Sequence, residues 1–547
     1  MPDTRVLRSL IVSSFYRSTL VRWMFVPVAL LTLSACGGSS SGSSGDASEI
    51  TGQPPETVQP SVTNVAIENA QPLLLIDDTL HLTANVATTG DATQEVTWSS
   101  SDTNVVTVST EGVLTGLTLG KASIEATSVF DPTQSISFDV RIVNGWDAEI
   151  NNPTDTNLRT VNVDRDGYVV AAGQFLDTTT TSLAQVIFFD PIGNSVWEYK
   201  RGHPTFKRVQ AEAVDFGSDG TIVVAENIAD FNIPDPSFVR VTRLNRTDGS
   251  VTDTLELKGS GDVKASDLDV GSDGNIVVAG ESSGRATVWE LKADTLTVAR
   301  EFHPRPDVTA DNNVESLVYG SDGTPIFVIR QASSFNVTTQ DGGSEIAVSQ
   351  IMDNSDNAYT VDSASGSSVL IAEGSNGTLA VAISLLDEAL VDGSFLYDSF
   401  AQVHFYGASP FESQPVATSR IVDRDEISGA EIASVSVTGL HATRDGGVIV
   451  VGELFDANTS DSVDVAVDNK TGQNWNAAQG FLQKYTNDGT LLWTRSTDAG
   501  IVALDVDEAG RIHAVTRTLN NRDDRDNPAA INVNVTVFGP DGTRAQQ

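Results

Sequence analysis

Apolar and polar residues alternate along most of the chain, in short stretches that are separated by aspartate and glycine. One such stretch, GSDGNIVVAG at 271–280, returns with small changes at 217–226, 320–329 and 444–453. Alternation with a period of two residues is typical of a half-buried strand, and Asp-Gly between two such strands is typical of a hairpin. The pattern therefore predicts an all-β protein.

The hairpin occurs seven times when its turn glycine is aligned. The turn glycines are Gly167, Gly220, Gly274, Gly323, Gly377, Gly446 and Gly510. A two-residue hairpin turn needs positive φ, which glycine adopts without steric cost. A second hairpin follows in most units, so each unit supplies four strands, as a propeller blade does. The repeats resemble the seven-bladed propeller repeats of bacterial surface and secreted proteins, and we expect a seven-bladed β-propeller at 144–547.

The last unit lacks a full set of strands. The chain after the seventh turn supplies a third strand at 531–538 and only the start of a fourth. Residues 144–150 precede the first hairpin, and Trp146 is placed like Trp197 of an outer strand. We predict that 144–150 pair with 531–538, because this closure removes an exposed sheet edge.

Residues 61–143 alternate in the same way without the repeat, which predicts an antiparallel sandwich of Ig-like size. The stretch VTWSSSDTNVVTVSTEGVLTGLTLGKASIEATS resembles the bacterial Ig-like group 2 domain. Its matching positions are Trp98, Val105, Val108, Val113, Leu117, Gly120, Ala122 and Ile124. In that family the domain is usually a spacer in surface proteins and is sometimes adhesive. Trp98 is expected in the core rather than in a ligand site.

A targeting segment precedes the β-rich part of the chain. Four arginines and a short apolar run lead to Leu33-Ser34-Ala35-Cys36-Gly37, and the run is too short for a comfortable membrane span. This order resembles the lipobox of bacterial lipoproteins, which implies a signal peptide at 1–35 and lipidation of Cys36. The alternative is an ordinary secretory signal. Gly37, where aspartate would signal inner-membrane retention in that family, implies the outer membrane of a Gram-negative cell.

The amino-acid composition and the net charge limit the kinds of partner that the protein can bind. Residues 36–60 are rich in Ser, Gly and Pro and are expected to be a flexible tether. Cys36 is the only cysteine, so no intrachain disulfide forms. The formal charge is −40, and it is −43 from Cys36 onward because residues 1–35 carry four arginines and one aspartate. Such a chain repels phosphate backbones, which argues against nucleic-acid binding.

The sequence offers no motif for catalysis or for metal binding. The six histidines are scattered, and GSSSG at 38–42 matches a serine-hydrolase motif but lies in the tether, without the strand and helix that the motif needs. The aspartates at 164–166 and 505–507 are interpreted as solvated turn formers, with a weak calcium site as the alternative. We expect no catalytic residue, no metal and no cofactor.

Two insertions lie between the second and third strands of the fifth and sixth units, at 384–399 and 454–479. We expect them to project side by side from one face, where function is usually placed. Carboxylates beside aromatic faces suit a carbohydrate or peptide ligand, and the alternative is that the aromatic residues pin the loops to the blades. The candidate binding residues are Asp392, Tyr397, Asp456, Asp464, Asp468 and Trp475, with Glu281 and Glu453 on the same face.

One position in each unit, seven residues after the turn glycine, is polar where its surroundings are rich in Val, Ile and Ala. These residues are Gln174, Asn227, Glu281, Arg330, Ser384, Glu453 and Arg517. One interpretation is a polar collar around the central channel. The other is that each strand ends there and its last residue meets water.

Together these features predict an outer-membrane lipoprotein that acts as a non-enzymatic binding, adhesion or scaffold protein. Its partners would be the membrane, through the lipid anchor, and a glycan or an envelope protein. Two alternatives stay open, namely a propeller enzyme that is quinoprotein-like or acts on glycans, and an assembly scaffold for other outer-membrane proteins. The sequence leaves open the oligomeric state and whether the folded body faces the periplasm or the cell exterior.

Overall fold

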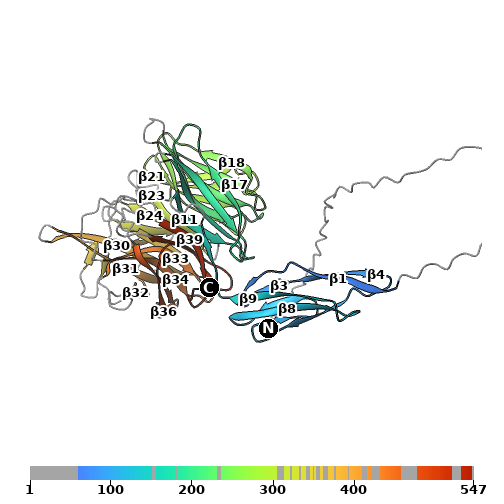
Figure 1. The fold of residues 1–547 in the computed structure, drawn as a ribbon. Helices are drawn as coiled ribbons and strands as arrows, with labels where there is room; N and C mark the ends of the chain where they lie inside the picture. Colours follow the sequence, from blue (N-terminus) through green and yellow to red (C-terminus); the bar gives the residue numbers. More distant parts are fainter. Residues whose placement is uncertain are drawn as a thin grey trace, which may run out of the picture. The chain divides into compact units, whose positions relative to one another are not determined.

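The computed structural model describes residues 59–544 with gaps, of which the widest are 305–312, 361–367, 409–414, 422–431, 457–476 and 520–530. The described residues form strands and no α-helix, which confirms the prediction of an all-β fold (Figure 1). In this part of the chain no helix is long and apolar enough to cross a membrane.

The first strands form a β-sandwich. They are β1 (Ser61–Glu68), β2 (Leu73–Leu75), β3 (Thr79–His81), β4 (Thr83–Thr89), β5 (Val96–Ser100), β6 (Val106–Val108), β7 (Val113–Gly116), β8 (Gly120–Ser128) and β9 (Ser135–Val143). One sheet has the order β2-β9-β8-β5 and another β3-β7-β6, while β1 pairs with β4. Leu82, Leu114 and Ile124 are buried between the sheets, and Trp98 packs against this core as predicted.

Seven four-stranded antiparallel units follow, and each is one blade, with strands A to D in chain order. Blade one contains β11 (Thr156–Val163), β12 (Val169–Thr178), β13 (Thr181–Phe189) and β14 (Ser195–Arg201). Blade two contains β15 (Arg208–Phe216), β16 (Ile222–Ala229), β17 (Phe238–Leu244) and β18 (Val251–Leu257). Blade three contains β19 (Val263–Val270), β20 (Ile276–Ser282), β21 (Arg285–Leu291) and β22 (Val298–Phe302). Blade four contains β23 (Asn313–Tyr319), β24 (Pro325–Gln331), β25 (Ser334–Thr339) and β26 (Glu345–Val348).

A small hairpin, β27 (Gln350–Met352) and β28 (Ala358–Thr360), separates blades four and five. Blade five contains β29 (Ser368–Glu373), β30 (Thr378–Val391), β31 (Ser394–Ala408) and β32 (Ala417–Ile421). Blade six contains β33 (Ile432–Ala442), β34 (Val448–Asp456), β35 (Ala477–Tyr485) and β36 (Leu491–Thr497). Blade seven contains β37 (Gly500–Val506), β38 (Ile512–Leu519), β39 (Ile531–Phe538) and β10 (Asp147–Glu149). Each A strand contacts the A strand of the next blade, and β37 contacts β11, so the seven blades form a closed ring around the axis.

The ring closes as the sequence predicts. Asp147 of β10 lies opposite Thr536 of β39, so the outer strand of the last blade comes from the N-terminal side of the propeller. The indole Nε1 of Trp146 donates to the Pro191 carbonyl of blade one at 2.8 Å. Apolar residues of blades one and seven form one buried cluster together with Trp146. Closure therefore combines a strand pairing with a shared core.

The seven turn glycines all have φ between 79° and 87°, as expected for turns that need positive φ. The turn type differs from the prediction. Gly167 N donates to Asp164 O at 3.1 Å and Asp164 N to Tyr168 O at 3.0 Å, while Asp166 lies outside the positive-φ region. This is a type I turn followed by a left-handed glycine, which joins antiparallel strands through a bulge. The Asp164 carboxylate stabilises it by accepting the Asp166 N–H at 2.9 Å.

Candidate functional site

Four titratable side chains lie on the innermost strands, each five positions before its turn glycine. They are Asp215 of β15, Asp269 of β19, His441 of β33 and Asp505 of β37, and we call them the inner cluster. The other three blades have Asn162, Val318 and Ala372 at this position. Because the A strands surround the propeller axis, the cluster lies near the axis, next to the A–B turns.

Two contacts organise the inner cluster. Asp505 Oδ1 lies 2.8 Å from His441 Nε2, and the Asp505 side chain is 13% exposed while that of His441 is 37% exposed. Asp215 and Asp269 lie close enough for the side chain of each to shift the pKa of the other. The cluster therefore consists of a carboxylate–imidazole pair and a pair of carboxyl groups.

The pKa values of the two pairs are shifted in different ways. Burial raises the pKa of Asp215 well above its ordinary value, and repulsion from Asp269 adds to the shift. Burial also raises the pKa of Asp269. Burial opposes the charge of His441 and of Asp505, but their attraction prevails, so the pKa of His441 is raised and that of Asp505 is lowered. Two carboxyl groups with raised pKa values and a His–Asp pair whose pKa shifts favour the charged forms thus share this site.

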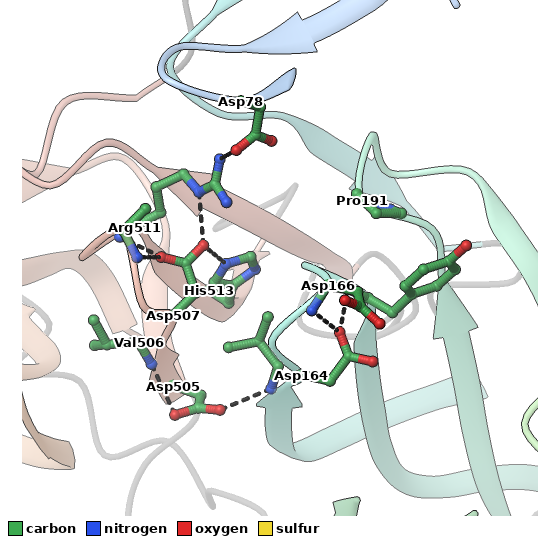
Figure 2. Close-up of polar contacts among 12 residues, drawn as sticks. Asp78, Asp164, Asp166, Pro191, Asp505, Val506, Asp507, Arg511 and His513 are labelled. Atoms are coloured by element: carbon green, nitrogen blue, oxygen red, sulfur yellow. Dashed lines mark hydrogen bonds and ion pairs between the residues drawn. The ribbon is translucent and has the colours of Figure 1, made fainter. Parts of the chain in front are cut away.

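The same aspartates connect successive blades. Asp215 Oδ2 accepts the Val270 N–H at 2.8 Å, Asp269 Oδ2 accepts that of Tyr319 at 3.1 Å, and Asp505 Oδ2 accepts that of Val163 at 2.7 Å. Figure 2 shows the last of these bonds, which joins blade seven to blade one. The interpretation of Asp505 as a solvated turn former is wrong, because its carboxylate is buried between the two blades.

Asp507 is a turn former, but it is buried rather than solvated. Its carboxylate accepts the Arg511 Nε–H at 2.6 Å and lies 3.1 Å from His513 Nε2 (Figure 2). Burial alone would raise the pKa of Asp507, but His513 and Arg511 outweigh it and bring the pKa to about 2. Arg511 Nη1 also lies 2.8 Å from Asp78 Oδ1, in the connection between β2 and β3. One buried carboxylate therefore orients the arginine that contacts the sandwich.

The B strands carry the polar residues that stand seven positions after each turn glycine. We call these seven residues the rim residues. The interpretation that the strands end there is wrong, because each B strand continues for at least one residue beyond its rim residue. Arg517 of blade seven forms two hydrogen bonds with Glu453 of blade six, at 2.9 and 2.7 Å. Burial raises the pKa of Glu453 although Arg517 opposes the shift. Glu281 pairs with Lys264 at 3.0 Å and is therefore also held by a cation.

Bulges in the A strands supply further partners for the rim residues. Six of the seven A strands have a register shift eight positions before the turn glycine, at Arg159, Glu212, Ser266, Glu315, Thr438 and Val502. A bulge sets one extra residue against its partner strand and redirects its side chain. Glu315 thereby pairs with Arg330 at 2.8 Å, and Glu212 accepts from Asn227 at 3.3 Å.

Sequence reasoning missed both the bulges and the inner cluster. Only the inner cluster left a signal in the sequence, because titratable residues recur five positions before the turn glycine in four of the seven units.

Most of the binding residues predicted in the two insertions lie outside the described residues. Asp392, Asp464, Asp468, Trp475 and Cys36 fall outside the described residues. The backbone of Tyr397 lies in β31, opposite Glu388, and Asp456 is the last residue of β34; their side chains are not described. The insertion at 384–399 is a continuation of the β30–β31 hairpin, which stays paired as far as Val391 opposite Ser394 (Figure 1).

Among the residues that the structure describes, no group of three or more His, Cys, Asp or Glu side chains is placed to hold a metal ion.

Residues 61–130 match the family model of the bacterial Ig-like domain (group 2). A curated relative, the 3-O-alpha-D-galactosyl-alpha-L-arabinofuranosidase of Bifidobacterium longum subsp. longum, is 41% identical over 69 residues. That match covers 13% of this chain and spans only 6% of the enzyme's length.

Solved propellers resemble this chain only distantly. The WD40 repeats of RRP9 align at 11% identity with a TM-score of 0.42, covering 72% of this chain and 97% of theirs. The β-propeller domain of the Trilobed protease from Pyrococcus furiosus aligns at 11% identity with a TM-score of 0.38. The alignment covers 72% of this chain and 98% of that domain. The polysaccharide lyase Uly1 aligns at 10% identity with a TM-score of 0.39. The alignment covers 72% of this chain and 92% of Uly1. The chain thus contains a bacterial Ig-like domain of group 2, matched at residues 61–130, followed by a seven-bladed β-propeller.

Proposed function

We propose that this protein is a non-enzymatic binding protein of the cell envelope, and that its propeller recognises a neutral, hydroxyl-rich glycan at the rim residues. The observation that carries the proposal is the repetition of a polar side chain at the same end of all seven B strands. The blade-five hairpin extends from the same end, and β34 and β35, the strands that flank the insertion of blade six, also meet there.

The chemistry of the rim favours hydroxyl groups as partners. Carboxylates and guanidinium groups are held there as pairs, such as Glu453 with Arg517 and Glu315 with Arg330. Paired charges keep acceptors and donors in fixed positions without a strong local excess of either charge, which suits a neutral ligand better than an ion. The chain's formal charge of −40 also opposes the approach of polyanions.

A glycan array tests this proposal. The full chain, carrying Cys36→Ala, is compared with a variant that lacks 454–479, each with and without calcium. Binding that weakens at least about tenfold without 454–479, while that variant keeps its unfolding temperature, supports recognition at this face. Equal binding by the two proteins, or no binding by either, contradicts it.

The inner cluster favours one alternative, an enzyme that acts on glycans. A carboxyl group with a raised pKa near a carboxyl group with a lowered pKa is an arrangement that general acid–base catalysis uses. However, Asp215 and Asp505 each already accept two backbone N–H groups, from their own strand and from the next blade. These bonds turn the carboxylates toward neighbouring strands, so we favour a structural role. Turnover of a retained glycan that is lost in Asp269→Asn would support the enzyme instead.

The envelope location rests on the lipobox-like sequence, and we propose that Cys36 anchors the protein to the outer membrane. Cys36→Ala removes the thiol that would carry the lipid, and the apolar run before it is too short to hold the chain in a bilayer by itself. We expect the variant in the soluble fraction and the parent chain in the membrane fraction. A variant that stays with the membranes would contradict lipid anchoring.

A further inference from the structure

A second polar pocket lies between blades six and seven, outside the rim. Its volume is about 260 Å³. The described lining comes from the end of the outer strand of blade six and residues 498–499, from the B and C strands of blade seven, and from the turn that follows the C strand. The lining residues that matter here are Arg495, Ser496, Thr497, Thr536, Thr543 and Arg544.

The outer strands of the two blades differ in length. β10 of blade seven contains three residues, whereas β36 of blade six contains seven. The turn that follows β39 contains Gly542, whose φ is +73°. A Cβ at Gly542 would come within 2.7 Å of the Trp493 ring, so only glycine lets the turn approach β36 this closely.

The lining offers hydroxyl groups and two guanidinium groups. Thr516 and Thr536 are buried and share a hydrogen bond of 3.1 Å between their Oγ1 atoms. The Arg495 guanidinium lies 5.4 Å from the Trp493 ring centre, and its Nη1 donates to the Thr494 carbonyl at 3.0 Å. A guanidinium has five N–H donors in a fixed fork, so further donors of Arg495 can reach a ligand.

Acidic neighbours balance the two arginines. Arg544 lies 2.9 Å from Asp147, and Asp498 lines the pocket. Burial raises the pKa of Asp541, but hydrogen bonds from Thr543 and, less strongly, the charge of Arg495 lower it below its ordinary value. Arg544 is thus paired with a carboxylate, and further carboxylates lie near the pocket, which disfavours an anionic ligand. The hydroxyl-lined wall likewise disfavours a hydrocarbon, because burying unpaired hydroxyl groups is costly.

We propose that this pocket binds a single neutral sugar residue. Its volume lies just below the range of about 300–1,000 Å³ that is usual for drug-sized ligands, which suits one ring. Side chains that pair with hydroxyl groups also discriminate strongly against analogues that lack them. None of the described lining residues is a rim residue, so the pocket is a second site beyond the proposed function.

Saturation-transfer NMR tests the proposal with D-galactose, D-glucose and D-galacturonate as probes, on the full chain carrying Cys36→Ala. Two further substitutions are compared. Arg495→Ala removes the donor fork, and Ser496→Trp fills the mouth of the pocket from an exposed position of β36. Arg444→Ala is the matched control, because this arginine is 72% exposed on the A–B turn of blade six and pairs with Glu508.

We expect saturation transfer to at least one neutral sugar, a loss of at least about tenfold in affinity in both pocket variants, and no change in Arg444→Ala. The variant that lacks 454–479 should still bind the sugar, which separates this site from the rim. The proposal fails if neither neutral sugar receives saturation, if Ser496→Trp binds as before, or if galacturonate binds more tightly than galactose.

Discussion

At the scale of single residues, two aspartates of the inner cluster have pKa values that are shifted in opposite directions. Asp215 and Asp505 occupy the same position of their blades, and each accepts a backbone N–H of the next blade. Asp215 lies beside another carboxyl group, whereas Asp505 lies beside His441. Burial raises the pKa of both groups; the carboxyl neighbour adds to this shift at Asp215, whereas the imidazole neighbour reverses it at Asp505.

Asp215→Asn should change the pH dependence of stability. A carboxyl group whose folded pKa is raised above 3.8 stabilises the fold only while it is protonated, so its contribution falls as the pH rises from 3.8 through the folded pKa. Asparagine removes this dependence and offers an N–H₂ group to Asp269. We expect the unfolding temperature of Asp215→Asn, relative to the parent chain, to be higher at roughly pH 8 than at roughly pH 4.

Asp219→Asn is the opposite-sign control for this measurement. The pKa of Asp219 is lowered, because its bonds from Thr221 outweigh the effect of burial. Its ionised form therefore stabilises the fold above 3.8, and the substitution should cost more at the higher pH. A relative unfolding temperature of Asp215→Asn that falls with rising pH would contradict the assigned protonation.

At the scale of elements, the A–B hairpin is the unit that the sequence repeats. Gly220 has φ +79°, and no atom would lie within 4 Å of a Cβ there, so the conformation alone requires glycine. Gly220→Ala should destabilise the protein by about 1–2 kcal/mol, measured by urea unfolding. The control is Gly407→Ala in β31, where a Cβ also meets open space and φ is not positive. Equal effects of the two substitutions would contradict a conformational role for Gly220.

The hairpins were predictable because their determinants are local. Glycine, the preceding aspartate and the flanking apolar residues all lie within about ten positions of each other. The bulges were not predictable in the same way, because a register shift depends on the partner strand and places no special residue type in the sequence. At the bulge positions, Glu212 and Val502 have nothing chemical in common.

At the scale of the whole molecule, ring closure couples the two ends of the propeller. Trp146 is 5% exposed, belongs to the cluster shared by blades one and seven, and donates to Pro191. Trp146→Ala should cost about 3–5 kcal/mol in the free energy of unfolding, since a large buried side chain and a hydrogen bond are lost together. Leu492→Ala is the control, because Leu492 is 53% exposed on β36.

Removal of 144–150 should lower the unfolding temperature further, because it also exposes β39. An unchanged unfolding temperature after this deletion, or a cost for Trp146→Ala no larger than that of Leu492→Ala, would contradict the closure. The pairing of 144–150 was predictable since the last unit lacked one strand. The ion pair between Asp78 and Arg511 was not, because 433 positions separate the two residues and no local pattern relates them.

The most direct test of binding without chemistry is to measure the masses of the glycans that the protein retains. Glycans captured by the full chain are held with it for hours, eluted, and measured by mass spectrometry beside glycans that were never exposed to the protein. A binding protein returns its ligand with an unchanged mass, and this is the result that we predict. Shortened or unsaturated glycans in the eluate, absent when Asp269→Asn is used, would contradict binding without chemistry and identify the inner cluster as catalytic.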